Sequence, residues 1–383
     1  MRLLHTGDLH LDSAFCAYGK RDAEDQRESG RRLLRRIFDT AREESCDMVL
    51  IAGDLFDGRF VTPETEALFY ELVENAHIPI VISPGNHDFY TDNSFYGKVR
   101  EKLGDALTLF CSNELQMFEF DDLQVRVFGY AFTSAVLSEN PLLQAQLPED
   151  DRYINIFCGH ADLAAVVSRY APITASQLIA RGFDYAALGH IHNRPECEDT
   201  DGRVRYCGFA QGRSFDEIGE GGVWIVDVER DSCRAERKKL SERAFFIADI
   251  DIGDADGFAS AEEIVRREVE KYACAKGVSL RVILSGRAED SVVSYLQSKR
   301  EEIAGECGIE YLEILDRTLP YIDGEYLERD TTLRGELYRT LLPRLTSDDA
   351  SERYLAVRAL RIGIAAIDGK SVFDASDREG GKA

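Results

Sequence analysis

Histidine, aspartate and asparagine side chains follow short hydrophobic runs at five places in this 383-residue chain. In each place the run ends at a glycine, and a residue type that binds metals comes directly after it. The five tracts are residues 3–10, 49–54, 80–88, 154–160 and 186–192. Apolar runs bounded by glycine are typical of buried strands, and groups beyond the carboxyl ends of strands in an open α/β sheet gather in one crevice. The pattern predicts a dinuclear metal site.

The spacing of the metal-binding residue types supports this prediction. Asp8 and His10 would point to the same side of an extended chain, and His190 and His192 share their spacing. One such pair alone is equally well explained by ordinary turn and loop residues. Five of the seven histidines follow the glycines of these tracts, however, which favours a metal site. Imidazole, carboxylate and amide donors together suit Mn2+ better than Mg2+, with zinc and iron as alternatives.

The acidic composition limits how the chain can bind nucleic acid. It has 46 basic and 70 acidic residues and a formal net charge of -24. A protein that binds DNA over its whole surface is normally basic, and two divalent ions would offset only four of these charges. A nucleic-acid substrate therefore requires local contacts or a partner that supplies phosphate binding. Residues 31–36 and 234–239 are candidate basic stretches, although each is also explained as a solvated face.

The remaining composition favours a cytoplasmic protein. The nine cysteines are scattered without a C-x-x-C pair, which is typical of reduced thiols. The first predicted strand begins almost at Met1, so we expect no leader segment. No apolar stretch has the length that a membrane helix needs, so we expect no membrane association.

Hydrophobic spacing predicts a layered α/β fold. Residues 30–44 and 63–76 have helical spacing and separate the first predicted strands, and Pro63 suits a first helical turn. Further on, strands are predicted at 115–120, 123–128, 204–207 and 223–228, with turns at Asp121-Asp122 and Asp201-Gly202. A pair of mixed sheets covered by helices fits this order better than one parallel sheet.

Charge rises over residues 229–243, which predicts a domain boundary there. Beyond it, strands at 245–252, 279–284 and 309–315 alternate with helices at 261–274 and 291–307, as in a small α/β module. Apolar stripes then predict helices around 333–345 and 354–367. The predicted domains are 1–235, 243–320, a helical partner-binding region at 330–370 and a loose tail at 371–383.

The motifs also resemble a known family. G-D-x-H, G-D-x-x-D, G-N-H-D, G-H and G-H-x-H, in this order, resemble those of calcineurin-like metallophosphoesterases, and more narrowly DNA-repair nuclease subunits of the SbcD and YhaO type. Residues 8–15, residues 211–215 and Gly219-Glu220 are similar to the YhaO branch. Leu9 stands where SbcD proteins usually have tryptophan. The resemblance covers about the first 230 residues and implies a four-layer α/β/β/α sandwich with a small α/β capping domain and C-terminal helices.

The resemblance assigns roles to individual residues. It implies seven metal ligands: Asp8, His10 and His192 on one ion, Asn86, His160 and His190 on the other, and Asp54 bridging both. His87 would donate a proton or hydrogen bond to the leaving oxygen. Asp57 would orient that imidazole, although a turn or helix-cap role explains it equally well. Asp12 and Arg213 would contact the substrate.

The function implied is a Mn2+-dependent phosphodiesterase that hydrolyses DNA, in which hydroxide formed between two metal ions attacks phosphorus. It would be the exonuclease subunit of a DNA-repair complex with an SMC-like coiled-coil ATPase, and association of two copies as a homodimer is a further expectation. Two alternatives stay open. A phosphoesterase for small substrates such as cyclic nucleotides is favoured by the acidic composition, and a weakly active regulatory subunit is disfavoured by the complete ligand set.

Overall fold

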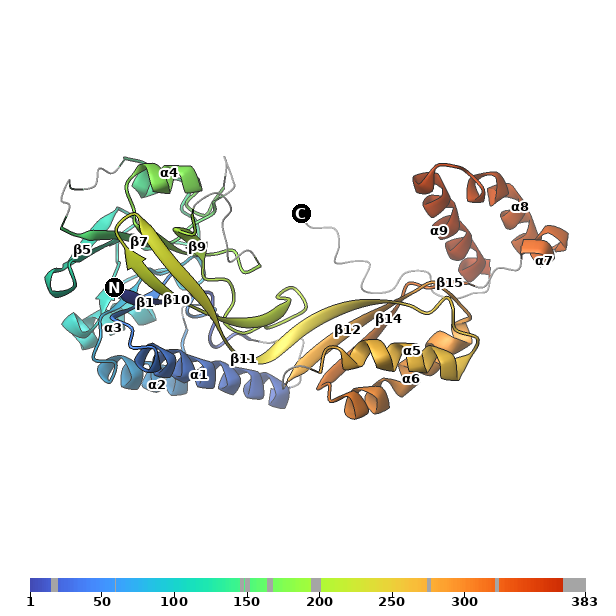
Figure 1. Ribbon diagram of the computed structural model, residues 1–383, viewed down its shortest axis with the longest axis horizontal. Helices are drawn as coiled ribbons and strands as arrows, with labels where there is room; N and C mark the ends of the chain where they lie inside the picture. Colours follow the sequence, from blue (N-terminus) through green and yellow to red (C-terminus); the bar gives the residue numbers. More distant parts are fainter. Residues whose placement is uncertain are drawn as a thin grey trace. The chain divides into compact units, whose positions relative to one another are not determined.

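The chain forms two compact units, shown in the computed structural model of Figure 1. The structure describes residues 1–14, 20–58, 60–144, 148, 152–163, 168–193, 201–273, 277–320 and 324–367. Unit 1 includes Met1–Phe246, and unit 2 includes most of the chain that follows. The division falls within the long strand β11 (Ser232–Asp251), so the charged stretch before it belongs to a strand.

Unit 1 contains two mixed sheets. The first places parallel strands side by side in the order β1, β2, β3 and β4, while β10 pairs antiparallel with β1 and β11 pairs antiparallel with β10. Six of its eight strands are β1 (Arg2–Thr6), β2 (Met48–Ile51), β3 (Ile80–Ile82), β4 (Thr108–Leu109), β10 (Gly219–Glu229) and β11. The parallel strands β1 to β3 are fully or almost fully buried, as their continuous apolar runs predicted.

The second sheet has the order β5-β6-β7-β8-β9. Its strands are β5 (Gln116–Phe120), β6 (Val125–Gly129), β7 (Ile154–His160), β8 (Tyr185–Gly189) and β9 (Val204–Tyr206). Only β5 and β6 are antiparallel, and a short 3-10 turn at Asp121–Leu123 joins them. Gln124 closes this turn in a left-handed conformation, so the predicted hairpin turn is confirmed.

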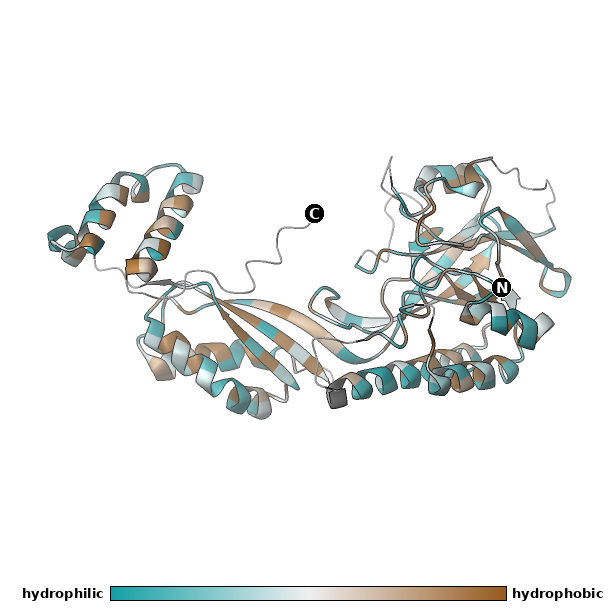
Figure 2. Cartoon of the chain, turned by 180° about the vertical axis from the view of Figure 1, so that it is seen from behind, coloured by the Kyte–Doolittle hydropathy of each residue, from teal (hydrophilic) through white to brown (hydrophobic). Residues whose placement is uncertain are grey.

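Four helices accompany these sheets among the described residues of unit 1. They are α1 (Lys20–Glu43), α2 (Pro63–Glu74), α3 (Phe95–Leu103) and α4 (Ala175–Ala180). Helix α1 begins ten residues earlier than its apolar spacing predicted, and its visible face is largely hydrophilic in Figure 2. Helix α2 begins as expected, because Thr62 caps it and Pro63 occupies its first turn.

The two sheets share one hydrophobic core. A single cluster of buried residues contains Leu4 and Ile51 of the first sheet and Val127 and Ile156 of the second. His5 lies in this interior, where its Nδ1 atom is 2.9 Å from the Tyr185 hydroxyl of β8. The prediction of an α/β fold with a pair of mixed sheets and helices is therefore confirmed.

Unit 2 contains the predicted alternation of strands and helices. Its elements after β11 are α5 (Phe258–Glu270), β12 (Val278–Ser285), β13 (Arg287–Ala288), α6 (Asp290–Cys307), β14 (Tyr311–Asp316), β15 (Leu319–Pro320), α7 (Gly324–Arg329), α8 (Leu333–Leu345) and α9 (Ala350–Ile367). Strands β12 and β14 are parallel. Helices α8 and α9 pack together, with Leu337 against Gly363. The predicted tail at 371–383 lies outside the described residues, and no described helix meets the length and hydropathy of a membrane span.

Candidate metal centre

Strands of both sheets deliver the predicted ligands to one place. Asp8, Asp54 and Asn86 follow β1, β2 and β3 of the first sheet, while His160 ends β7 and His190 follows β8 of the second. The loops after β1 and β2 lie side by side, since Asp8 N donates to Gly53 O at 3.0 Å and His10 N donates to Asp54 O at 2.9 Å. The carboxyl ends of five strands therefore meet at one site, as the glycine-bounded tracts predicted.

Three overlapping groups of side chains have the composition of metal ligands. Within each group, one ligand atom per residue lies within 4.8 Å of the others. The groups are Asp8 with His10 and His192, His10 with Asp54 and His87, and Asp8 with Asp54 and His160. Asp54 links the groups, because its Oδ2 atom is 3.4 Å from His160 Nε2 and 3.7 Å from His10 Nε2.

Asn86 and His190 lie beside His160. The Asn86 Oδ1 atom is 2.9 Å from His160 Nε2, so the amide oxygen faces the same point as that imidazole. The His190 ring packs against the rings of His160 and Tyr170, with centroids 5.1 Å and 4.6 Å away. Burial, with the nearby His160, lowers the pKa of His190 to about 4, which keeps this imidazole neutral near pH 7.

The backbone at the site differs from the extended geometry predicted for the Asp8/His10 and His190/His192 pairs. Asp8 and His10 have φ values of 48° and 46°, and His190 has φ 110°. The prediction that His190 and His192 point the same way is wrong: His190 faces His160, while His192 faces His10. Such φ values are costly for residues other than glycine and are found where a site constrains the chain.

Glycines make room for the ligand side chains themselves. A Cβ atom on Gly85 would collide with the carboxylate of Asp54, and one on Gly53 would collide with the His160 ring. A Cβ on Gly189 would collide with the Ala52 carbonyl. These three glycines therefore allow the strand ends of the two sheets to approach closely enough for their ligands to converge.

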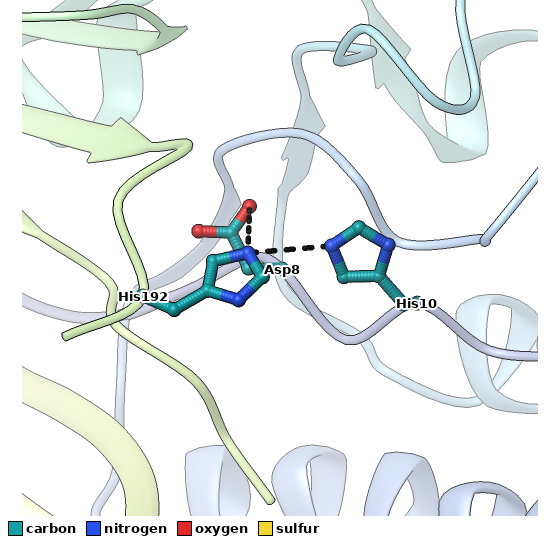
Figure 3. Close-up of side chains that lie close together, drawn as sticks. All are labelled: Asp8, His10 and His192. Atoms are coloured by element: carbon teal, nitrogen blue, oxygen red, sulfur yellow. Dashed lines mark hydrogen bonds and ion pairs between the residues drawn. The ribbon is translucent and has the colours of Figure 1, made fainter. Parts of the chain in front are cut away.

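His10 and His192 face each other through their Nε2 ring nitrogens. Their Nε2 atoms are 3.4 Å apart, and Figure 3 shows them beside the Asp8 carboxylate. Each ring has its Nδ1 atom on a carboxylate, at 3.1 Å from Asp57 for His10 and 2.7 Å from Glu217 for His192. A neutral imidazole that donates from Nδ1 carries its lone pair on Nε2. Two lone pairs and a carboxylate oxygen directed at one point fit a bound cation.

Asp57 contacts the imidazoles of both His10 and His87. Its Oδ1 atom is 3.1 Å from His10 Nδ1 and 3.5 Å from His87 Nδ1. Burial raises the pKa of Asp57, but the hydrogen bonds with His10 and His87 outweigh burial and hold it well below its usual value. Asp57 in turn raises the pKa of His87, whose side chain is exposed. His87 is thus placed at the open side of the site, in a state that favours carrying a proton.

The central carboxylate remains ionised despite its burial. Burial acts to raise the pKa of Asp54, but His160, His10 and His87 surround it and together lower that pKa. The His87 backbone amide also donates to Asp54 Oδ1 at 2.9 Å. An ionised carboxylate between imidazoles is the donor that a divalent cation prefers over a neutral acid.

The two predicted substrate contacts occupy different surroundings. Both carboxylate oxygens of Asp12 accept hydrogen bonds at the start of α2, from Thr62 N at 2.7 Å and Thr65 Oγ1 at 2.8 Å. Arg213 lies at the metal centre, where its guanidinium is 2.6 Å from Glu217 and 3.9 Å from Asp57. Asp12 therefore anchors Thr62, the residue that caps α2, and Arg213 lies in the network of predicted ligands.

Three polar residues that support the ligands were not predicted from the sequence. Glu217 accepts from His192, Cys207 donates its thiol hydrogen to Asp8 Oδ2 at 3.1 Å, and buried Asp88 accepts from the Gly85 amide at 2.8 Å. Asp88 is the last residue of the G-N-H-D motif, in which roles were assigned only to Asn86 and His87. Glu217 and Cys207 follow no glycine-bounded tract, so the pattern that predicted the ligands contained no signal for them.

Comparison with known proteins assigns the family. The family model described as calcineurin-like phosphoesterase matches residues 1–194, just over half of the chain. The chain belongs to this family, and the resemblance stated from its motifs is confirmed. It is a metallophosphoesterase whose Asp and His groups have the composition of a dinuclear metal site.

Three relatives indicate which members of the family this chain resembles. The chain is 26% identical over 301 residues to the "uncharacterized metallophosphoesterase YhaO" of Bacillus subtilis, which covers 76% of this chain and 73% of YhaO. It is 26% identical to the SbcD component of the SbcCD nuclease of Staphylococcus epidermidis, over 60% of this chain and 66% of that one. It is 30% identical to the DNA double-strand break repair protein Mre11 of Halobacterium salinarum, over 69% and 67%. The chain is thus related to YhaO, SbcD and Mre11 proteins.

Proposed function

We propose that this protein is a Mn2+-dependent phosphodiesterase that hydrolyses DNA as the exonuclease subunit of a complex with an SMC-like ATPase. The chemistry is supported by the family and by the ligand groups around Asp54. The DNA substrate is supported by two relatives whose names describe part of a nuclease and a DNA double-strand break repair protein.

The observation that carries the proposal is the position of Asp54 between two sets of donors. Its Oδ2 atom faces His160 on one side and His10 on the other. We assign Asp54 as the bridging ligand of two divalent ions. Asp8, His10 and His192 hold one ion, and Asn86, His160 and His190 hold the other. Two ions held this way polarise a phosphate and lower the pKa of a bound water.

The other side chains act on the substrate. His87 is exposed at the edge of the ligand groups, and Asp57 raises its pKa, so it can donate a proton to the leaving oxygen. Asp57 keeps the ring of His87 oriented. Arg213 places its charge beside the same groups, where a phosphate oxygen would be bound. Substrate contact by Asp12 stays a prediction that rests on the resemblance.

The remaining parts of the chain fit this proposal. We infer that the two sheets of unit 1 and their helices form the four-layer α/β/β/α sandwich, that residues 243–320 form a capping domain, and that residues 330–370 bind the ATPase. Helices α8 and α9 mix hydrophobic and hydrophilic residues (Figure 2), and Leu333, Tyr354 and Leu355 are exposed on them. An ATPase that binds an amphipathic helix pair would also supply the basic surface that a chain of net charge -24 lacks.

The test is a direct assay of the purified chain. With Mn2+, it is expected to shorten end-labelled duplex DNA and to hydrolyse a chromogenic phosphodiester, and both activities are expected to disappear with a chelator. Replacement of Asp54 by asparagine provides an inactive control of the same size. Hydrolysis of the chromogenic ester without any shortening or internal cleavage of DNA would contradict the nuclease.

A second candidate is a phosphoesterase for small substrates such as cyclic nucleotides. The net charge of -24 favours it, because a small ester needs no extended basic surface. The same assay separates the two candidates. A chain that hydrolyses cyclic nucleotides far faster than DNA, with or without the ATPase, supports the second candidate.

A further inference from the structure

We propose that Glu217 is a positioning residue that prepares His192 as a metal ligand, an inference that rests on the proposed two-metal function. Glu217 comes from the segment between β9 and β10, outside all five of the tracts that supply ligands. It is nevertheless buried, with 4% of its surface exposed, beside the Asp8, His10 and His192 group. A buried carboxylate needs partners for both oxygens, and the partners of Glu217 identify its role.

Both Glu217 oxygens are engaged. Oε1 is 2.7 Å from His192 Nδ1 and 2.6 Å from Arg213 Nη2. Oε2 accepts from the Arg213 backbone amide at 2.8 Å and from its Nε atom at 3.3 Å. Arg213 therefore offsets the charge of the carboxylate and occupies the lone pairs that His192 does not use. Held this way, Glu217 is directed at the imidazole and not into the ligand group.

The segment that carries Glu217 is itself fixed at two further points. Gln211 donates to Ser29 Oγ of α1 at 2.9 Å and accepts from the Glu242 amide of β11 at 2.9 Å. On the other side, Asn193 Nδ2 donates to the Asp216 carbonyl at 2.7 Å. Two consecutive residues, His192 and Asn193, are therefore bound by two consecutive residues of the segment.

This arrangement selects one form of His192. A metal-binding imidazole must be neutral with a free lone pair, and a carboxylate that accepts from Nδ1 leaves that lone pair on Nε2. The Nε2 atom of His192 is the one that faces His10 and Asp8. Without Glu217 the ring could place its proton on either nitrogen and could rotate away. Glu217 thus holds the orientation and the tautomer that a metal ion requires before the ion binds.

The experiment is a Mn2+ titration of the full chain by calorimetry and by the EPR signal of free Mn2+. Glu217→Gln keeps the shape of the side chain and removes its charge. It is expected to weaken one of two bound ions about 10- to 100-fold and the other by less than about threefold, with an unchanged melting temperature of the metal-free protein. Glu220→Gln, the same change at a residue paired with Lys239, is expected to bind both ions like the wild type.

The variant Arg213→Ala distinguishes the role of the Glu217 carboxylate from that of the Arg213 guanidinium. It keeps the backbone amide of residue 213 that donates to Oε2, so Glu217 can still accept from His192, and the affinity for both ions is expected to stay within about threefold of the wild type. Excess Mn2+ is expected to restore hydrolysis of the chromogenic ester by Glu217→Gln, because the ligands themselves are intact.

Several results would overturn the inference. One is a Glu217→Gln chain that binds both ions as tightly as the wild type. Another is an equal loss of both ions together with a lower melting temperature, which would show that Glu217 only stabilises the segment. A third is an Arg213→Ala chain that weakens the same ion as strongly. A wild type that binds two ions but cleaves no DNA would refute the proposed nuclease without affecting this titration, and a wild type that binds fewer than two ions would refute both.

Discussion

His5 is buried between the two sheets as a neutral imidazole, so acidic pH is expected to destabilise the folded chain. It has no exposed surface, its Nδ1 atom accepts from the Tyr185 hydroxyl at 2.9 Å, and its Nε2 atom faces the Leu188 carbonyl at 3.2 Å. Burial lowers the pKa of His5 to about 3, and the charges of Arg237 and Arg205 act in the same direction, against the hydrogen bond to Leu188.

The sign of the pH effect follows from the two states. The unfolded chain takes up a proton at His5 near pH 6.5, whereas the folded chain resists protonation down to about pH 3. Stability from this residue is therefore complete above pH 6.5 and is lost as the pH falls from 6.5 towards 3. From these two pKa values, the contribution of His5 to the free energy of unfolding is expected to fall by about 2 kcal/mol between pH 7 and pH 5.

The assay compares urea unfolding of metal-free wild type and His5→Gln at pH 7 and pH 5. Glutamine keeps a donor for Leu188 and an acceptor for Tyr185 but does not titrate. The decrease in the free energy of unfolding on acidification should be about 2 kcal/mol larger for the wild type than for His5→Gln. His77→Asn is the control, because His77 is exposed, and it is expected to retain the wild-type decrease. Equal decreases in wild type and His5→Gln would refute the reasoning.

Three further predictions concern the proposed metal centre and its partner. Asp54→Ala is expected to abolish hydrolysis and to lower the occupancy of both ions, and elemental analysis showing two full equivalents would rule out the bridging role. His87→Ala is expected to keep both ions while turnover slows about 10²- to 10⁴-fold, the usual contribution of a positioned proton donor; loss of metal would make His87 a ligand instead, and full activity on DNA would remove its role as the acid. Removal of residues 331–383 is expected to spare hydrolysis of the chromogenic ester and to abolish co-purification with the ATPase. A truncated chain that still binds the ATPase tightly would contradict the partner-binding role of α8 and α9. One that unfolds would show that these helices only stabilise the fold of unit 2.

Two local predictions from the sequence differ from the structure. The apolar spacing predicted a helix from residue 30, but α1 begins at Lys20. Apolar spacing missed the first turns because they are polar, with ion pairs such as that of Arg27 with Glu24. The paired residues Asp8 and His10 were expected on an extended chain, but both have positive φ. The helix thus continues beyond the segment that its apolar spacing marks, whereas the strand period was extended past Thr6, where β1 ends.

Asp57 and Asp12 show a related limit. The sequence suggested that Asp57 orients His87, and the structure places it within 3.5 Å of His87 and closer still to His10. Asp12 was expected at the substrate, which stays a prediction, and the structure shows its oxygens accepting from Thr62 and Thr65 at the start of α2. A carboxylate in a turn has many available partners, and only the loops that pack against it determine which of them it binds.

The strands, the family and the convergence of His and Asp side chains at the strand ends could all be predicted from the amino-acid sequence. Those features are local: an apolar run buries itself, a glycine allows close approach at its end, and the next residue is exposed to the crevice. Packing of the folded chain determines that two sheets contribute to one centre, that His190 and His192 face different neighbours, and that Glu217, Cys207 and Asp57 support particular ligands. Glu217 and His192 are 25 residues apart, and Cys207 and Asp8 are 199 apart. Contacts at such separations depend on how whole strands and loops pack, and no short pattern in the chain encodes them.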